Sequence, residues 1–190
     1  MTSPVIIERK TLLINPWLEV AARVVRGMPG STGDQEFYVV RPRDYVSVVA
    51  TTTEGGLLLV RQYRPAVDRM TLELPSGLLD PGETPADTAR RELFEETGYV
   101  ANTVEHLGTL LPDTGRYENR LWCYAAEGVE PAPDWQVPDD GVERVVVPVP
   151  ELLSLITSGA FDHALHLAVV MLAVAHGRLA ALRPPGMPGI

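Results

Sequence analysis

One stretch, Gly77 to Tyr99, constrains the fold of this chain more than any other. Its residues read GLLDPGETPADTARRELFEETGY. Pro81 and Gly82 fit a tight turn, because Pro presets φ and Gly tolerates positive φ. Thr84 then fits a helix N-cap, and Gly98 fits the left-handed residue that ends a helix. The stretch therefore predicts a turn followed by a helix over residues 86–97, whose apolar face is formed by Ala86, Ala89, Leu93 and Phe94.

Three glutamates share one face of this predicted helix. Glu92, Glu95 and Glu96 stand at i, i+3 and i+4, so their side chains are neighbours. Their negative charges repel one another, and Arg91 offsets only part of that charge through Glu95. A hard divalent cation relieves the repulsion, because carboxylate oxygens are the ligands that Mg²⁺ and Mn²⁺ select. The alternative for such a run, taken alone, is a solvated acidic helix face.

The whole stretch resembles the Nudix box, the signature of the Nudix hydrolases. That pattern requires Gly, then Glu after five residues, then Arg-Glu-aliphatic-any-Glu-Glu-any-Gly-aliphatic after seven more. The chain fills it with Gly77, Glu83, Arg91, Glu92, Leu93, Glu95, Glu96 and Gly98. Tyr99 departs from the usual aliphatic residue at the last position, which bears on packing more than on chemistry. The resemblance implies an α+β fold of the Nudix α/β/α sandwich type, with a mixed β-sheet.

The resemblance also implies a reaction and the residues that perform it. Nudix hydrolases cleave a diphosphate linked to another group, using water and divalent cations. By this likeness Glu92 and Glu96 are metal ligands, Glu95 belongs to the same cluster, and the carbonyl of Ser76 is a further ligand. Arg91 orients a neighbouring glutamate and Glu83 supports the metal shell. The expected catalytic group is thus Glu95, Glu92, Arg91 and Glu83, with Mg²⁺ or Mn²⁺ as the metal.

The general base is left open between two places. Family members carry it either within the box or on a loop between later strands. In this chain the second alternative indicates Asp139, Asp140 or Glu143.

Residues outside the box indicate the substrate class. Val60 to Ala66, followed by Leu72 to Gly77, is similar to the ADP-ribose pyrophosphatase branch of the family. Arg64 and Arg61 are then expected to hold a terminal phosphate or ribose, and the alternative for both is a solvated strand edge. Gly77 is also assigned to the substrate site. Glu118 belongs to a polar cluster that either reaches the substrate or caps a loop.

The leading hypothesis is hydrolysis of ADP-ribose, or of a related nucleoside diphosphate sugar, to a nucleoside monophosphate and a sugar phosphate. One alternative is cleavage of another diphosphate, such as an oxidised nucleoside triphosphate or a dinucleoside polyphosphate. The other is a non-catalytic sensor of nucleotide sugars, because fold alone does not determine function. Such sensors often lose box carboxylates, and this chain keeps all of them.

The composition of the chain limits the classes of partner that it can bind. The formal net charge of −9 over 190 residues argues against a general binder of nucleic acid or acidic membranes, which needs a basic surface. Cys123 is the single cysteine, so no intrachain disulfide forms, and together with the absence of a signal-peptide pattern this favours the cytoplasm. His163 and His166 fall on one apolar helix and are expected to be core or surface residues rather than zinc ligands.

Strand-like alternation precedes and surrounds the box. Residues 5–14, 17–25 and 36–41 predict a small antiparallel sheet, which is marginal alone and therefore predicts a homodimer. In the ADP-ribose pyrophosphatase branch this sheet exchanges between two subunits. The expected organisation is residues 1–44 as a dimerisation element, 45–182 as the Nudix hydrolase domain, and 183–190 as a disordered tail. Further predicted strands are 45–52, 56–62, 70–74, 104–111, 119–126 and 143–149. Residues 128–141 are predicted as a loop, and residues 150–158 and 161–182 as helices.

Overall fold

The computed structural model describes residues 3–15, 18–137 and 141–182. The chain divides into two compact units. One unit contains Met1–Asp44 and Leu110–Leu121, and the other contains Tyr45–Thr109 and Trp122–Ile190. The predicted tail, residues 183–190, lies outside the described residues.

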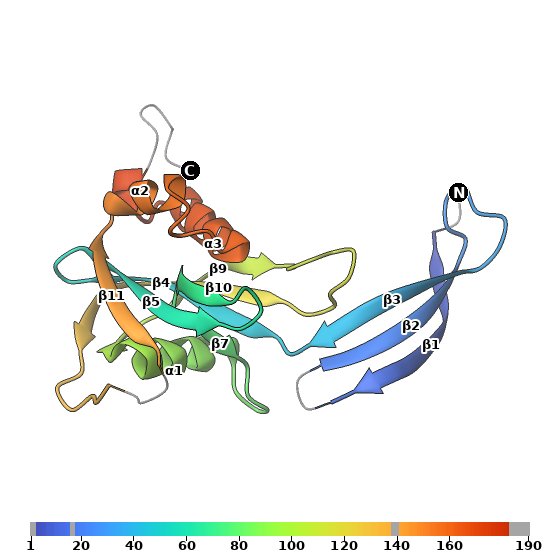
Figure 1. Cartoon of the computed structure of the whole chain (residues 1–190), viewed down its shortest axis with the longest axis horizontal. Helices are drawn as coiled ribbons and strands as arrows, with labels where there is room; N and C mark the ends of the chain where they lie inside the picture. Colours follow the sequence, from blue (N-terminus) through green and yellow to red (C-terminus); the bar gives the residue numbers. More distant parts are fainter. Residues whose placement is uncertain (1–2, 16–17, 138–140, 183–190) are drawn as a thin grey trace. The chain divides into compact units, whose positions relative to one another are not determined.

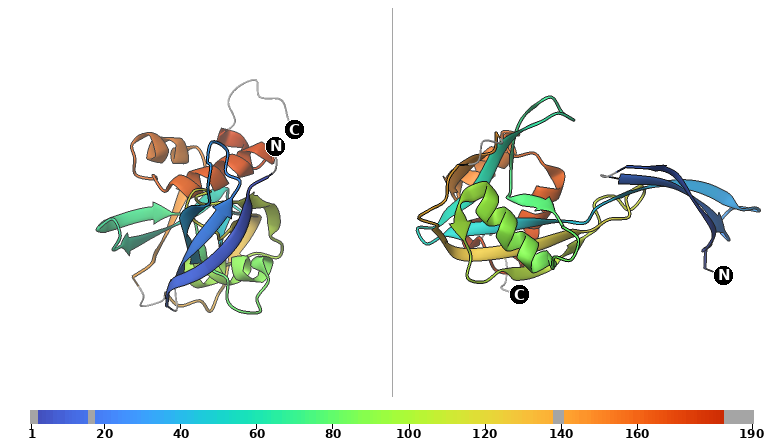
Figure 2. Two further views of the ribbon diagram at one scale, coloured as in Figure 1. Left: turned by 90° about the vertical axis from the view of Figure 1, so that its right-hand side faces the viewer. Right: turned by 90° about the horizontal axis from the view of Figure 1, so that it is seen from below.

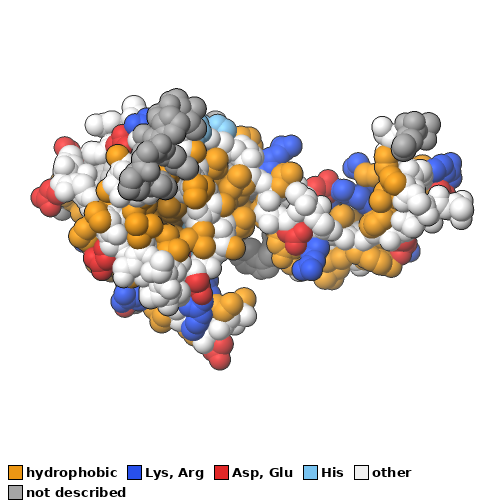
Figure 3. Space-filling model, turned by 90° about the horizontal axis from the view of Figure 1, so that it is seen from above, with side chains coloured by type: hydrophobic (Ala, Val, Ile, Leu, Met, Phe, Trp, Pro, Cys, Tyr) orange, Lys and Arg blue, Asp and Glu red, His pale blue; other side chains and the backbone are white. Residues whose placement is uncertain are grey.

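The first unit is built on a three-stranded antiparallel sheet. β1 (Val5–Ile14), β2 (Leu18–Arg26) and β3 (Gln35–Pro42) lie in the order β1-β2-β3. The three strands predicted from alternation are confirmed, although Trp17 lies outside the described residues. Every residue of β1 is exposed, including Ile6, Leu13 and Ile14. Figure 3 shows apolar side chains on the surface of this unit. The unit therefore leaves apolar strand surface in water, which is unusual unless something covers it.

The second unit is a sheet with helices on both faces. Its strands β4 (Tyr45–Thr52), β5 (Gly56–Arg64), β8 (Tyr99–Val100), β10 (Leu121–Pro131) and β11 (Glu143–Pro148) run in the order β11-β5-β4-β10-β8. β6 (Arg69–Glu73) pairs with β5, β7 (Ser76–Leu78) pairs with β4, and β9 (Glu105–Leu110) pairs with β10. Helix α1 (Pro85–Thr97) lies on one face, and α2 (Glu151–Thr157) and α3 (Ala164–Ala175) lie on the other (Figures 1 and 2).

The core between α1 and the sheet explains why the box helix lies where it does. Ala89 and Leu93 are fully buried against β4 residues such as Val46 and Val48. Full burial of a leucine or valine side chain contributes about 1.5–3 kcal/mol to the stability of the fold. The predicted α/β/α arrangement is thus confirmed, with the apolar face of α1 turned to the sheet. The assignment of Phe94 to that face is wrong, because its side chain is 40% exposed.

Four elements differ from the sequence prediction. β10 continues through Gly128 to Pro131, so the first part of the predicted loop is strand. It continues because β8, which the sequence did not indicate, pairs with its end at Glu130 and Pro131. β7 was not indicated either. The long helix predicted over residues 161–182 is shorter, since His163 caps α3 and a turn at Gly177 separates it from the 3-10 helix Ala180–Leu182. No helix in the described ranges is long and apolar enough to cross a membrane.

Candidate active site

The ends of α1 carry the caps that its sequence predicts. The Thr84 hydroxyl accepts a hydrogen bond from the Asp87 N–H at 3.2 Å, and Pro85 occupies the first turn. At the other end Gly98 has φ 72°, and its N–H donates to the Phe94 carbonyl at 2.8 Å. With Ala89 and Leu93 buried, Glu92 and Glu96 are partly buried and Glu95 is exposed. The helix therefore presents its carboxylates in two environments, one enclosed and one open to water.

Arg91 gathers three of the box glutamates around one guanidinium. Its Nε and Nη2 donate to the two carboxylate oxygens of Glu83 at 2.9 and 3.0 Å. Its Nη1 donates to Glu92 at 2.8 Å and to Glu95 at 2.9 Å. The hydrogen bonds from Arg91 and Thr88 lower the pKa of Glu83 to about 2. Arg91 thus holds Glu83 ionised and fixes the direction of Glu92, which agrees with the orienting role that the family resemblance implies.

Gly77 makes room for the Glu92 carboxylate. A Cβ placed on Gly77 would lie 2.0 Å from the carboxyl carbon and from Oε1 of Glu92. Gly77 does not adopt a left-handed backbone, so the requirement for glycine here is space rather than conformation. Strand β7 and helix α1 approach so closely at this point that any other side chain would displace the carboxylate.

Glu96 is the most deeply enclosed carboxylate of the group. Its Oε2 accepts a hydrogen bond from the Ser76 N–H at 2.9 Å. Burial raises the pKa of Glu96 to about 8 despite that bond, and the charge of Glu92 adds to the rise. Burial also raises the pKa of Glu92. Two partly buried carboxylates whose charged forms are disfavoured by burial are compensated by a divalent cation, so the residues present fit a Mg²⁺ or Mn²⁺ ion.

An ion pair between the partly exposed Arg64 and the buried Glu73 lies beside this cluster. Arg64 donates from Nε and Nη2 to the two oxygens of Glu73 at 2.8 and 2.6 Å, and Glu73 is only 1% exposed. Burial acts to raise the pKa of Glu73, but the bonds from Arg64 and Thr71 outweigh it and lower the pKa to about 2. The charge of Arg64 also acts on Glu96. Arg64 therefore does more than lie on a solvated strand edge, because it is bound to a buried carboxylate.

The other predicted site residues lie in several places. Arg61 and Glu143 face each other on β5 and β11, with their charged atoms 3.7 Å apart. Glu118 belongs to the first unit, where it pairs with Arg23 and Arg41. Asp139 and Asp140 lie outside the described residues. The structure thus brings Glu83, Arg91, Glu92, Glu95, Glu96, Ser76 and Gly77 together. The assignments of the base and of substrate contacts stay predictions.

Two residues near the site received no role from the sequence. The sequence shows Glu73 only as the acid of the Glu-Leu-Pro-Ser-Gly run before the box, and nothing in that run indicates that its side chain is buried. Thr88 is fully buried, and its hydroxyl donates to Glu83 at 2.9 Å. Its position one helical turn after the N-cap Thr84 was the only available signal.

A family model supplies the decisive comparison. The model described as the NUDIX domain matches residues 41–168. The chain belongs to the Nudix family. This Nudix chain is 37% identical over 100 residues to a methanol dehydrogenase activator of Bacillus methanolicus, covering 53% of each chain. It is 32% identical over 122 residues to an ADP-ribose pyrophosphatase of Bacillus subtilis, covering 63% of this chain and 66% of the relative. The matches thus span between half and two thirds of these two relatives.

Solved structures show the same fold. A crystal structure of an ADP compounds hydrolase superimposes with a TM-score of 0.78 and 23% identity, covering 92% of this Nudix chain and 94% of that chain. At this identity the likeness concerns the fold alone. The superposition covers most of this chain. The match to the family model confirms the predicted resemblance to the Nudix family.

Proposed function

We propose that this protein hydrolyses the diphosphate of ADP-ribose or a related nucleoside diphosphate sugar, giving a nucleoside monophosphate and a sugar phosphate. The observation that carries the proposal is the intact carboxylate cluster, in which Arg91 binds Glu83, Glu92 and Glu95 and the Ser76 N–H binds Glu96. The names of relatives, an ADP-ribose pyrophosphatase among them, support the substrate class. The alternative diphosphate substrates are distinguished by a comparison of kcat/KM over a substrate panel, because specificity is a ratio of transition-state affinities.

Glu92, Glu96 and the Ser76 carbonyl are the proposed metal ligands, with Glu95 at the open side of the cluster. These residues would hold Mg²⁺, which would supply positive charge for the diphosphate oxygens and lower the pKa of a coordinated water. The chain's own residues prepare that site: Arg91 holds Glu92 in direction, Gly77 leaves it space, and the Ser76 N–H fixes Glu96. The general base remains assigned to the box or to Asp139, Asp140 or Glu143.

The proposed organisation follows the sequence prediction. Residues 1–44 form a dimerisation element and residues 45–182 the hydrolase domain. The exposed apolar residues of β1 support a homodimer, because a second copy of the chain is the simplest cover for them. The single, buried cysteine supports a reducing compartment such as the cytoplasm. Size-exclusion chromatography with light scattering at several concentrations tests the homodimer.

The substitution Glu96→Gln tests the enzyme against the sensor. It removes one negative ligand but keeps the shape and the bond from Ser76. For an enzyme we expect turnover of ADP-ribose to fall by about 10²-fold or more while ADP-ribose binding changes little. Release of AMP, followed by chromatography with Mg²⁺ present, measures turnover, and calorimetry measures binding. Equal turnover in the variant and the wild type would reject the metal role of Glu96.

A further inference from the structure

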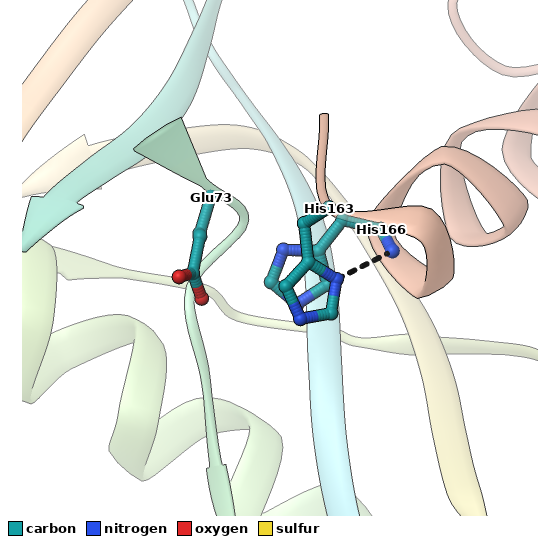
Figure 4. Close-up of side chains that lie close together, drawn as sticks. All are labelled: Glu73, His163 and His166. Carbon is teal, nitrogen blue, oxygen red and sulfur yellow. Dashed lines mark hydrogen bonds between the residues drawn. The ribbon is translucent and has the colours of Figure 1, made fainter. Parts of the chain in front are cut away.

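A cavity of about 380 Å³ opens beside the ion pair of Arg64 and Glu73, next to the residues that precede α3. Its polar lining consists of Arg64, Arg69, Thr71, Glu73, Asp162 and His163. Figure 4 shows Glu73 from strand β6 and the two imidazoles of His163 and His166 gathered at one place. Four of these six lining residues have no role in the proposed metal centre or in the diphosphate site, so the cavity needs its own explanation.

By residue type the cluster resembles a transition-metal site. One potential ligand atom from each of Glu73, His163 and His166 lies within 4.8 Å of the others. The hydrogen bonds argue against a metal at this place. The Leu74 N–H donates to Nδ1 of His166 at 3.0 Å, and the His166 N–H donates to Nδ1 of His163 at 3.3 Å. Because a backbone N–H is always a donor, each Nδ1 must supply its lone pair.

The tautomer of both rings follows from these bonds. A neutral imidazole whose Nδ1 accepts a hydrogen bond carries its proton on Nε2, where it has no lone pair for a metal. Burial lowers the pKa of His163 and lowers that of His166 to about 3, so both rings are neutral near pH 7. Metal-bound histidines show the reverse arrangement, in which the second nitrogen donates. The cluster therefore presents N–H donors rather than metal ligands.

The charges around the cavity are balanced. Arg64 is bound to Glu73 through two hydrogen bonds, and Arg69 is bound to Asp162. With neutral histidines, two positive and two negative side chains remain, and they cancel. A free phosphate group needs net positive charge, which this lining does not offer. Carboxylates paired with guanidinium and imidazole N–H groups instead offer alternating acceptors and donors, the pattern that fits the hydroxyl groups of a sugar.

The cavity is also placed next to the reaction. Arg64 and Glu73 both act electrostatically on Glu96, the enclosed carboxylate of the metal cluster. Glu73 precedes Ser76 by three residues on the strand that leads into the box. Arg64 and Glu73 therefore link the cavity to the proposed metal cluster, because both line the cavity and both act on Glu96.

From this geometry we propose that the cavity binds the polyhydroxylated sugar ring of the nucleoside diphosphate sugar, with Asp162 and Nε2–H of His163 contacting its hydroxyl groups. The inference rests on the proposed function and names the part of the substrate that the cavity takes. Asp162 accepts from hydroxyl groups while Arg69 holds its direction, and His163 donates from the fixed tautomer.

The substitution Asp162→Asn tests this subsite. Asp162 is 43% exposed, so the fold tolerates the amide. The matched control is Glu127→Gln, an acid paired with Arg178 on a different cavity of about 280 Å³. We expect Asp162→Asn to raise KM for ADP-ribose about tenfold with little change in kcat, the size of one charge-assisted hydrogen bond. Glu127→Gln should leave both constants at the wild-type values.

Direct binding of the two products separates the subsite from the catalytic centre. Calorimetry with ribose-5-phosphate should show weaker binding to Asp162→Asn, whereas AMP should bind both proteins equally. The imidazole N–H signal of His163 should shift on addition of ribose phosphate and stay in place with AMP. Unchanged binding of ribose phosphate in Asp162→Asn, or an equal loss for AMP, overturns the proposal.

Failure of the proposed function has a different signature. A wild-type protein that leaves every nucleoside diphosphate sugar intact rejects the hydrolase, but its binding of ribose phosphate still decides the subsite. Binding that Asp162→Asn weakens and Glu127→Gln does not supports the cavity as a sugar site. Absence of any ribose phosphate binding to the wild type overturns it.

Discussion

The close approach of Gly77 to Glu92 allows a sharp test of the site. Replacing Gly77 by Ala places a methyl carbon 2.0 Å from the Glu92 carboxyl group, where ordinary contacts begin at 3.4 Å. The carboxylate is the far end of a flexible side chain, so it moves and the backbone does not. The movement needed is about 1.4 Å, and a misplacement of about 1 Å near the reacting groups costs on the order of 10²-fold in rate.

We therefore expect Gly77→Ala to separate activity from stability. Its backbone is not left-handed, and the gain of about 0.4–1 kcal/mol that a Gly to Ala change gives at an unstrained position offsets the cost of moving the Glu92 side chain. kcat for ADP-ribose should fall roughly 10²-fold and Mn²⁺ should bind more weakly, while Tm is not lowered. Gly33→Ala is the matched control, because a Cβ there meets nothing within 4 Å.

The measurements are steady-state release of AMP, calorimetric titration with Mn²⁺, and thermal unfolding of both variants. If Gly77→Ala keeps the wild-type kcat and metal affinity, Glu92 does not act from the place the structure gives it, and the reasoning is refuted. A large loss of Tm with the loss of activity would instead show that β7 cannot accept the methyl group.

Two further predictions concern Arg91 and His166. Arg91→Lys removes the guanidinium that binds both Glu83 and Glu92, so the affinity for Mn²⁺ should fall about 10–100-fold. Arg90→Lys, on the exposed side of α1, should leave that affinity unchanged. Calorimetric titration of both variants with Mn²⁺ measures this, and equal affinities would contradict it. Because His166 has a folded pKa of about 3 against 6.5 unfolded, the unfolded chain binds more protons in that window. The contribution of the neutral His166 to the free energy of unfolding is fully present above pH 6.5. It falls by roughly 1.4 kcal/mol per pH unit as the pH drops toward 3. Urea unfolding at several pH values should show a steeper acid loss for the wild type than for His166→Gln; equal slopes would contradict the assignment.

The local part of the site could be predicted from the sequence. The caps at Thr84 and Gly98 and the spacing of the glutamates depend on residues within one helix, so their positions follow from helical geometry. The same holds for the first strands, where alternation of apolar and polar residues indicates the sheet. The family pattern contains the glycine at position 77, but the reason for it, the lack of space for a Cβ 2.0 Å from the Glu92 carboxyl group, required coordinates.

The remaining parts depend on contacts between distant segments. β10 extends past Gly128 because β8 pairs with it, and local turn signals at Gly128 and Pro131 conceal that pairing. Glu73 is buried, and it stays ionised because Arg64 and Thr71 donate hydrogen bonds to it. The sugar cavity combines residues from β5, β6 and the start of α3, which no periodicity in the sequence brings together.

The bond from the Leu74 amide to the His166 ring joins positions 92 residues apart and has a practical consequence. It anchors the strand just ahead of Ser76 and Gly77 from the opposite side of the sheet. Shortening the chain before α3, or exchanging that helix for one from a relative without the histidine, would release the segment that presents the carbonyl of Ser76. Engineers who graft this catalytic box into another scaffold need to bring the rear helix with it.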